Sequence, residues 1–131
     1  MDKSGYDARN ASKEHPMDKA LLEQGGINVN EALERMMGNE KLLSRLLGKF
    51  LEDASCERLA QAIAVQDAQA AAEAAHTLKG VSGNLSISTV YDLASRQCDL
   101  FRSGAWEEGC ALMPQVEDAC RIAQDAIRAG A

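Results

Sequence analysis

The chain has 131 residues, a net charge of −6 and an aromatic content of 4%. A chain of this length can form one domain around a single core, without disulfides or a structural metal. The acidic balance argues against nucleic acid and anionic membrane surfaces as partners. No apolar run approaches the roughly 18 residues of a membrane span, and the N-terminus lacks the apolar core of a secretion signal. We therefore expect a cytoplasmic protein with no direct membrane insertion.

The composition favours helices over strands. Alanine, leucine, glutamate and glutamine are abundant, and such unbranched side chains lose little rotamer freedom in a helix. Residues 1–16 are polar and lack periodicity, so we interpret them as a disordered tail or interdomain linker, which contains a solvated His15. The folded domain is predicted to span residues 17–131.

The N-terminal part of this domain predicts two short helices. Residues 17–24 can form a helix that ends at the glycine pair 25–26, because glycine tolerates the left-handed conformation that often follows a helix. Asn28 and Glu31 have the spacing of a capping box. A second helix is therefore expected from this point to about Met37.

Longer amphipathic helices follow. From residue 39 to residue 63, apolar residues recur at helical spacing, which predicts one long core helix. Asp67 can cap the next helix, which is expected to end near Asn84. Ser88 or Thr89 can start another helix, which reaches residues 103–104.

A last helix is predicted over residues 105–128, with a kink or a late start at Pro114. Four long amphipathic helices joined by short connections bury their apolar stripes against one another. The sequence therefore predicts an all-α fold, an antiparallel four-helix bundle with a short N-terminal helical lid. Such a bundle buries all of its stripes, so we expect a monomer.

The four cysteines are Cys56, Cys98, Cys110 and Cys120. They form no CxxC pair, and each falls within a helical pattern, so the spacing of a structural metal site is absent. We interpret them as reduced thiols packed as small apolar groups, with a redox function as the alternative.

The segment AHTLKGVSGNLS combines a histidine, a lysine and two glycines inside a predicted helix. At about 100° per residue, His76 lies about 200° from Leu78, so it faces solvent if Leu78 faces the core. Lys79, Gly80 and Gly83 all fall within about 60° of His76 on the same face. These residues are therefore predicted to share one exposed patch.

Two glycines inside a helix call for an explanation, because each costs roughly 1 kcal/mol relative to alanine. Missing side chains beside His76 would let another protein bring a reactive group close to the imidazole. A neutral imidazole is a good nucleophile near pH 7, and phosphoryl transfer requires positioning and nearby cations, which Lys79 supplies. The alternative is a solvated surface histidine with glycines at a frayed helix end.

The run AAHTLKGVSGNLS resembles the H-x-L-K-G signature of histidine-containing phosphotransfer (HPt) domains. The resemblance continues through GINVNEALERMMGNEKLLSRLLGKFLED and the helix at residues 93–104, covering roughly residues 26–128. It implies a four-helix bundle whose phosphorylated residue would be His76. Lys79 would then be the phosphate-facing cation, and Gly80 and Gly83 the residues that give a partner clearance.

The same resemblance implies the partners. The histidine would take a phosphoryl group from a receiver-domain aspartate, within a hybrid sensor histidine kinase or a separate protein, and pass it to another receiver. Magnesium would be supplied at the partner receiver, and this chain would bind no cofactor of its own. No glycine-rich loop marks a nucleotide site, so we expect no autokinase activity.

Two features near the signature differ from the family pattern or extend it. Ser86 stands where many members have a further glycine. Some members place a polar residue of the following helix on the histidine, and the matching positions here are Arg96, Gln97 and Cys98. Gln97 is the candidate for that contact. Glu73 can hydrogen-bond the imidazole from one turn earlier, or it is a solvated helix charge.

The rival functions are a metal enzyme, a hydrolase and a docking module. No motif places a Ser or Cys nucleophile beside His76, which argues against the hydrolase. Glu73 and His76 have the Glu-x-x-His spacing of di-iron bundles, but such a site needs a second copy of the motif, and the other histidine lies in the predicted tail. We therefore expect no metal site. The stronger rival is an HPt-like docking module that binds a receiver or kinase without carrying phosphate.

Overall fold

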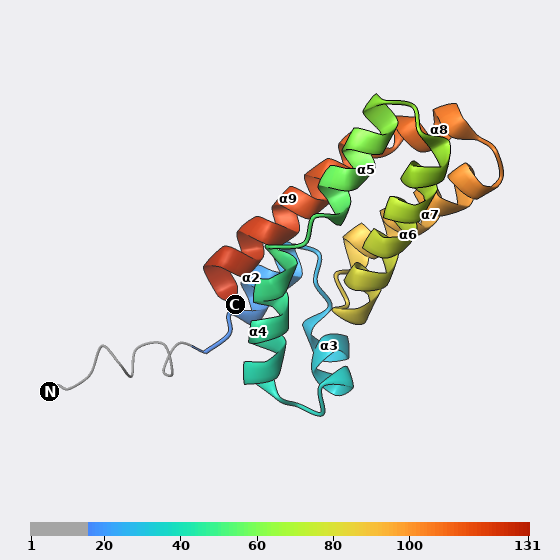
Figure 1. The fold of residues 1–131 in the computed structure, drawn as a ribbon. Coiled ribbons are helices and arrows are strands. Elements are labelled where there is room, and N and C mark those ends of the chain that lie inside the picture. Colours follow the sequence, from blue (N-terminus) through green and yellow to red (C-terminus); the bar gives the residue numbers. More distant parts are fainter. Residues whose placement is uncertain (1–15) are drawn as a thin grey trace, which may run out of the picture.

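The computed structural model describes residues 16–131, which fold almost entirely into helices (Figure 1). Residues 1–15, with His15 and nearly all of the predicted tail, lie outside the described residues. Within the described part, β pairing is limited to an isolated antiparallel bridge between Ile27 and Ile87. The predicted all-α fold is confirmed.

Two short helices, α2 (Lys19–Gln24) and α3 (Val29–Arg35), form the predicted N-terminal lid. The side chain of Asp18 caps α2 by accepting a hydrogen bond from the backbone N–H three residues on. Asn28 caps α3 in the same way, accepting from the N–H of Glu31 at 3.1 Å. Half of the predicted capping box is therefore present, because the N–H of Asn28 donates to the carbonyl of Ser86 and not to the Glu31 side chain. Helix α3 ends two residues earlier than expected.

The long helix predicted over residues 39–63 is wrong, because the chain forms two helices there, α4 (Glu40–Phe50) and α5 (Ser55–Ala64). After α4 the chain tightens into a turn, in which the N–H of Leu51 bonds back three residues at 3.2 Å. The carboxylate of Asp53 then accepts a hydrogen bond from the N–H of Ser55 at 3.0 Å. This bond satisfies a free N–H at the start of α5, which makes the interruption stable.

The next two helices are α6 (Ala68–Asn84) and α7 (Ser88–Arg102). Asp67 caps α6 by accepting from the backbone N–H of Ala70 at 3.0 Å, which confirms the predicted cap and the predicted end. The start of α7 agrees with the prediction, but Ile87 occupies its cap position without a side-chain hydrogen bond. Neither predicted capping side chain is therefore used.

The C-terminal segment contains α8 (Trp106–Ala111) and α9 (Met113–Gly130). Pro114 lies in the first turn of α9, where proline is tolerated because its missing N–H would have no helical partner there. The late start predicted at this residue is confirmed. The segment before it forms a separate short helix.

Helices α5, α6, α7 and α9 are neighbours in a closed order and form the antiparallel bundle (Figure 1). Helix α9 is the longest of the four, and α4 and α2 also pack against it. The ends of the described chain meet there, because the N–H of Asp18 donates to the carbonyl of Gly130 at 2.9 Å. The lid is thereby joined to the bundle.

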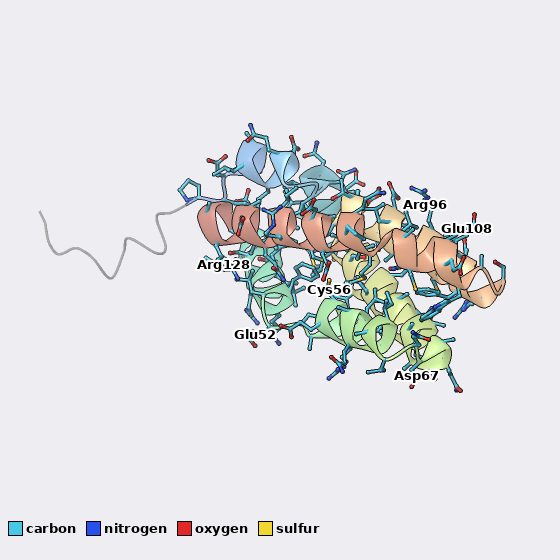
Figure 2. All side chains as sticks on the ribbon, turned by 90° about the horizontal axis from the view of Figure 1, so that it is seen from above. Glu52, Cys56, Asp67, Arg96, Glu108 and Arg128 are labelled. Carbon is cyan, nitrogen blue, oxygen red and sulfur yellow. The ribbon has the colours of Figure 1, made fainter. Side chains whose placement is uncertain are left out.

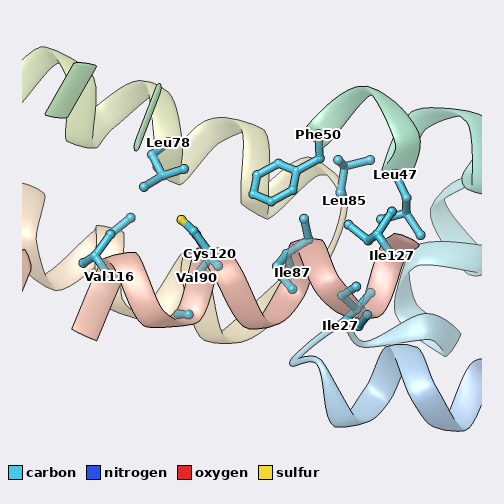
Figure 3. Packing of buried hydrophobic residues seen from close by; sticks show 14 of the residues in the cluster. Ile27, Leu47, Phe50, Leu78, Leu85, Ile87, Val90, Val116, Cys120 and Ile127 are labelled. Atoms are coloured by element: carbon cyan, nitrogen blue, oxygen red, sulfur yellow. The ribbon is translucent and has the colours of Figure 1, made fainter. Parts of the chain in front are cut away.

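The core runs the length of the bundle and continues beneath the lid (Figure 3). Leu22 of α2, Leu47 of α4, Leu78 of α6 and Val116 of α9 are all fully buried. Burial of such side chains, about 1.5–3 kcal/mol each, is the main stabilising contribution to the fold. The lid therefore shares the core of the bundle instead of lying loosely on its surface.

Charged side chains point away from the helices, as the labelled Glu52, Asp67, Arg96, Glu108 and Arg128 show (Figure 2). Over residues 16–131, no helix combines the length and the apolar character that crossing a membrane requires.

Candidate functional site

Helix α6 presents two different faces, and His76 lies on the outer one. Its inner face buries Ala71, Ala75, Leu78 and Ser82 in the core. His76 is exposed, as expected from its angle to Leu78. The alanines favour helix formation strongly enough for this segment to accommodate glycines further along.

A cavity of about 510 Å³ opens beside His76. Helix α6 forms one wall with Lys79 and Gly80, and α7 forms another with Tyr91. The lid completes it with Glu31 and Arg35 of α3. Three separate segments of the chain therefore form this cavity beside one imidazole.

Gly80 leaves open space next to His76. It is exposed, and a Cβ atom added there would meet no heavy atom of residues 16–131 within 4 Å. Packing within this part of the chain therefore gives no reason for glycine at this position, although glycine weakens a helix. An approaching surface can use this space.

Gly83 has a different environment, and the prediction that both glycines leave open space is wrong for this residue. A Cβ atom at Gly83 would lie 2.9 Å from Cδ1 and 3.0 Å from Cε1 of Tyr91. The aromatic ring of α7 fills the space that the missing side chain leaves. Gly83 therefore permits close packing of α6 against α7.

Cationic and anionic side chains both line the cavity. Lys79 is half-buried on α6, and Arg35 is the last residue of α3. Glu31 and Asp92 contribute carboxylates to the same lining. A phosphoryl group in this cavity would have two cations within its walls, which suits the negative charge spread over its oxygens in the transition state.

Arg102, in the last turn of α7, contacts the histidine directly. Its Nη2 atom lies 3.3 Å from Nδ1 of His76. A guanidinium group only donates hydrogen bonds, so Nδ1 accepts this one and carries no proton. In the neutral ring the proton is therefore on Nε2. Sequence reasoning missed both Arg102 and Arg35.

Gln97 does not take the place predicted for it. Its side chain is fully buried, and its Nε2 atom donates to the carbonyl of Gly109 at 2.9 Å. Gln97 thus joins α7 to α8 inside the core, and the prediction of a contact with His76 is wrong. Cys98 is fully buried as well.

Glu73 also has other partners in the structure. Its carboxylate lies 3.5 Å from Nε2 of Gln69, and its backbone carbonyl accepts from the hydroxyl of Thr77 at 3.0 Å. The hydrogen bond proposed from Glu73 to the imidazole is therefore not formed. The alternative interpretation, a solvated charge on α6, describes its position.

Ser86, in the connection after α6, shows why glycine suits this place. Its φ angle is +55°, in the left-handed region where a Cβ atom is unfavourable. The residue is only 3% exposed, and its hydroxyl has no hydrogen-bond partner among the residues that the structure describes. The backbone carbonyl of Ser86 does have a partner, because it accepts a hydrogen bond from the N–H of Asn28 at 2.8 Å. This bond connects the lid to the turn after α6.

In the described residues, no three His, Cys, Asp or Glu side chains lie close enough together to hold a metal ion.

Comparison with known proteins bears on the chemistry of the site. Neither the curated proteins nor the solved structures contain a match to the chain. Residues 45–126, more than half of the sequence, match the family model described as Hpt domain. Hpt domains are phosphotransfer modules of two-component systems and interact with response-regulator receivers. The chain therefore belongs to the Hpt domain family.

Proposed function

We propose that this protein is a phosphorelay intermediate, in which His76 accepts a phosphoryl group from a receiver aspartate and passes it to another receiver. The observation that carries the proposal is the exposed imidazole beside the open space at Gly80. A receiver must bring its aspartyl phosphate within bonding distance of the imidazole, so clearance beside the histidine is required. The family membership supports the same chemistry.

In the proposed step, a ring nitrogen of His76 forms a bond to phosphorus as the bond from phosphorus to the aspartate oxygen breaks. The aspartate carboxylate is the leaving group, and the proton of the neutral ring stays on the other ring nitrogen. Magnesium belongs to the receiver and offsets the phosphoryl charge there. Lys79 and Arg35, which line the cavity, supply positive charge from this chain.

Arg102 determines which nitrogen is ready to react. While it donates to Nδ1, the proton of the neutral ring is on Nε2, so Nε2 has no free electron pair. Attack through Nε2 therefore requires the contact to open and Nδ1 to take up the proton. The released guanidinium group is then free to bind phosphoryl oxygens.

Further parts of the proposal concern the context of the chain. We infer that it has no autokinase activity, that a hybrid sensor histidine kinase or its receiver is upstream, and that it works as a cytoplasmic monomer. The competing function is a docking module that binds a receiver or kinase without carrying phosphate. The two functions differ in whether His76 becomes labelled.

The test is transfer of labelled phosphate from a phosphorylated receiver to the full chain and to His76→Gln. We expect label on the wild type alone, lost in acid and stable in base, as phosphohistidine is. Receivers that bind the chain but never label it would favour the docking module. Equal labelling of His76→Gln would show that another residue is the acceptor.

A further inference from the structure

Two cysteines from opposite ends of the bundle sequence lie together in the structure. Cys56 is half-buried in the first turn of α5, and its place is labelled in Figure 2. Cys120 lies in the middle of α9 and is 3% exposed, with its sulfur directed into the interior between the helices (Figure 3). Helices α5 and α9 pack against each other.

Both side chains line one cavity of about 300 Å³. Charged residues surround this opening, among them Glu117 and Arg121 of α9 and Arg128 near its end. The cavity opens to solvent beside the half-buried Cys56, whereas Cys120 is almost wholly buried behind it. Of the other cysteines, Cys98 is fully buried on α7 and Cys110 lies on α8, and neither lines this cavity.

The two thiols influence each other's ionisation. The neighbouring Cys120 thiol lowers the pKa of Cys56, and the neighbouring Cys56 thiol raises the pKa of Cys120. Burial and the carboxylates of Asp53, Glu57 and Glu117 oppose the lowering at Cys56. A position in the first turn of a helix favours a thiolate through the helix dipole. Cys56 is therefore the more nucleophilic of the two, with Cys120 behind it as the second thiol.

We propose that Cys56 and Cys120 form a reversible disulfide between α5 and α9, with a hydroperoxide as the oxidant and Cys56 as the residue that reacts first. The juxtaposition of two thiols at one solvent-accessible cavity carries this proposal. It does not depend on phosphate transfer by His76, because the two cavities have no residue in common.

The chemistry has two steps. The Cys56 thiolate attacks a peroxide oxygen, an S–O bond forms as the O–O bond breaks, and the leaving oxygen takes up a proton. The Cys120 sulfur then attacks the sulfenic acid, an S–S bond forms as the S–O bond breaks, and water leaves. In total, two thiols lose two electrons and two protons, and hydrogen peroxide is reduced to two molecules of water.

The bond would join the first and last helices of the bundle. A disulfide that closes a long loop restricts the unfolded chain and stabilises the folded one. We expect the oxidised protein to unfold at a temperature about 5–15 °C higher than the reduced protein. Labelling of His76 by a phosphorylated receiver is expected to be the same for the oxidised and the reduced protein, because the cavity at His76 and the cavity at the cysteines share no residue.

The first experiment treats the folded full chain with hydrogen peroxide and maps its cysteines. We expect accessible thiols after denaturation to fall from four to two, and one peptide pair linked through Cys56 and Cys120. Cys110→Ser is the matched control and should keep this link, whereas Cys56→Ser and Cys120→Ser should lose it. Links between other cysteines, or between two chains, would overturn the proposal.

The second experiment tests the order of the reaction with dimedone, which traps sulfenic acids. In Cys120→Ser, peroxide should give a dimedone adduct at Cys56, since no second thiol is there to remove the intermediate. In Cys56→Ser, the adduct at Cys120 should be at least tenfold weaker. An equal or stronger adduct at Cys120 would contradict the assignment of Cys56 as the first reacting thiol.

Discussion

The two faces of α6 differ in burial and in residue type, although they belong to the same 17-residue helix. The inner face consists of small and apolar residues, and Leu78 is fully buried among its neighbours. The outer face presents His76 and Gly80, which are exposed and gain little from packing. The inner residues contribute to stability, and the proposed docking of a receiver would explain the outer residues.

This contrast separates two kinds of substitution. A change on the inner face should alter the free energy of unfolding and leave the chemistry of each folded molecule intact. A change on the outer face should alter phosphate transfer without lowering the free energy of unfolding appreciably. Gly83 packs on Tyr91 and also lines the cavity beside His76, so a substitution there combines both kinds of effect.

The largest expected effect is the loss of stability in Leu78→Ala. Removing a fully buried leucine side chain should lower the free energy of unfolding by about 2–5 kcal/mol, because it leaves a cavity. His76→Gln, two residues away on the outer face, should change the same quantity by less than about 0.5 kcal/mol. Urea denaturation of both variants measures this. Equal destabilisation by the two substitutions would remove the distinction between the faces.

Gly80→Gln is expected to slow phosphate transfer about tenfold, which corresponds to about 1.4 kcal/mol in the barrier. The added side chain would occupy the open space beside His76. Gly48→Gln on α4 is the matched control, because a Cβ atom there also meets nothing within 4 Å. Both substitutions should raise helix stability by up to about 1 kcal/mol.

Rates of transfer from a phosphorylated receiver, measured for both variants, decide the role of Gly80. Slowing in Gly80→Gln alone would support the clearance role. If Gly48→Gln slowed transfer equally, or if neither variant did, the space beside His76 would have no role in docking.

A third comparison concerns Gly83 and Tyr91. Gly83→Ala should gain less stability than an ordinary helical glycine substitution, because the new Cβ atom would press on the ring 2.9 Å away. In a Tyr91→Ala background the same substitution should be more favourable by about 1 kcal/mol. Denaturation of the four proteins in this double-mutant cycle measures the difference. Additive effects would mean that the ring moves aside freely.

The smallest expected effect is at Arg102. Its contact with Nδ1 favours the tautomer with the proton on Nε2 by roughly 0.5–1.5 kcal/mol, the net contribution of one hydrogen bond. Arg102→Gln should therefore increase the fraction of the other tautomer severalfold. Nitrogen-15 chemical shifts of the His76 ring above pH 8 report this fraction directly. Unchanged shifts would mean that the guanidinium contact does not persist in solution.

The sequence predicted most of the fold, because capping residues and apolar spacing are local signals. Asn28, Asp67 and Pro114 each mark a helix start that the structure contains. The interruption between α4 and α5 was missed because Leu51 and Ala54 continue the apolar spacing through it. A signal was present, since Asp53 stands two residues before Ser55 and can cap the new helix.

The candidate site was predicted less completely, because its members come from three helices. The exposed position of His76 follows from helix geometry alone. In an antiparallel helix pair, residues equally far from the connection face each other, which places Arg96 near the level of His76. Arg102 lies more than a turn beyond that level and reaches back with its long side chain. Its contact therefore depends on the packing angle of α7, which sequence spacing does not specify.

The position of the lid in the sequence affects how partner recognition can change during evolution. The family match begins at residue 45, whereas the wall formed by Glu31 and Arg35 precedes it in the chain. The bond from the N–H of Asn28 to Ser86 holds that wall against the connection between α6 and α7. His76 and the wall that shapes its surroundings are thus encoded in separate stretches. Under the proposed function, substitutions in α3 can change which partner surface fits, while the helix that carries His76 stays the same.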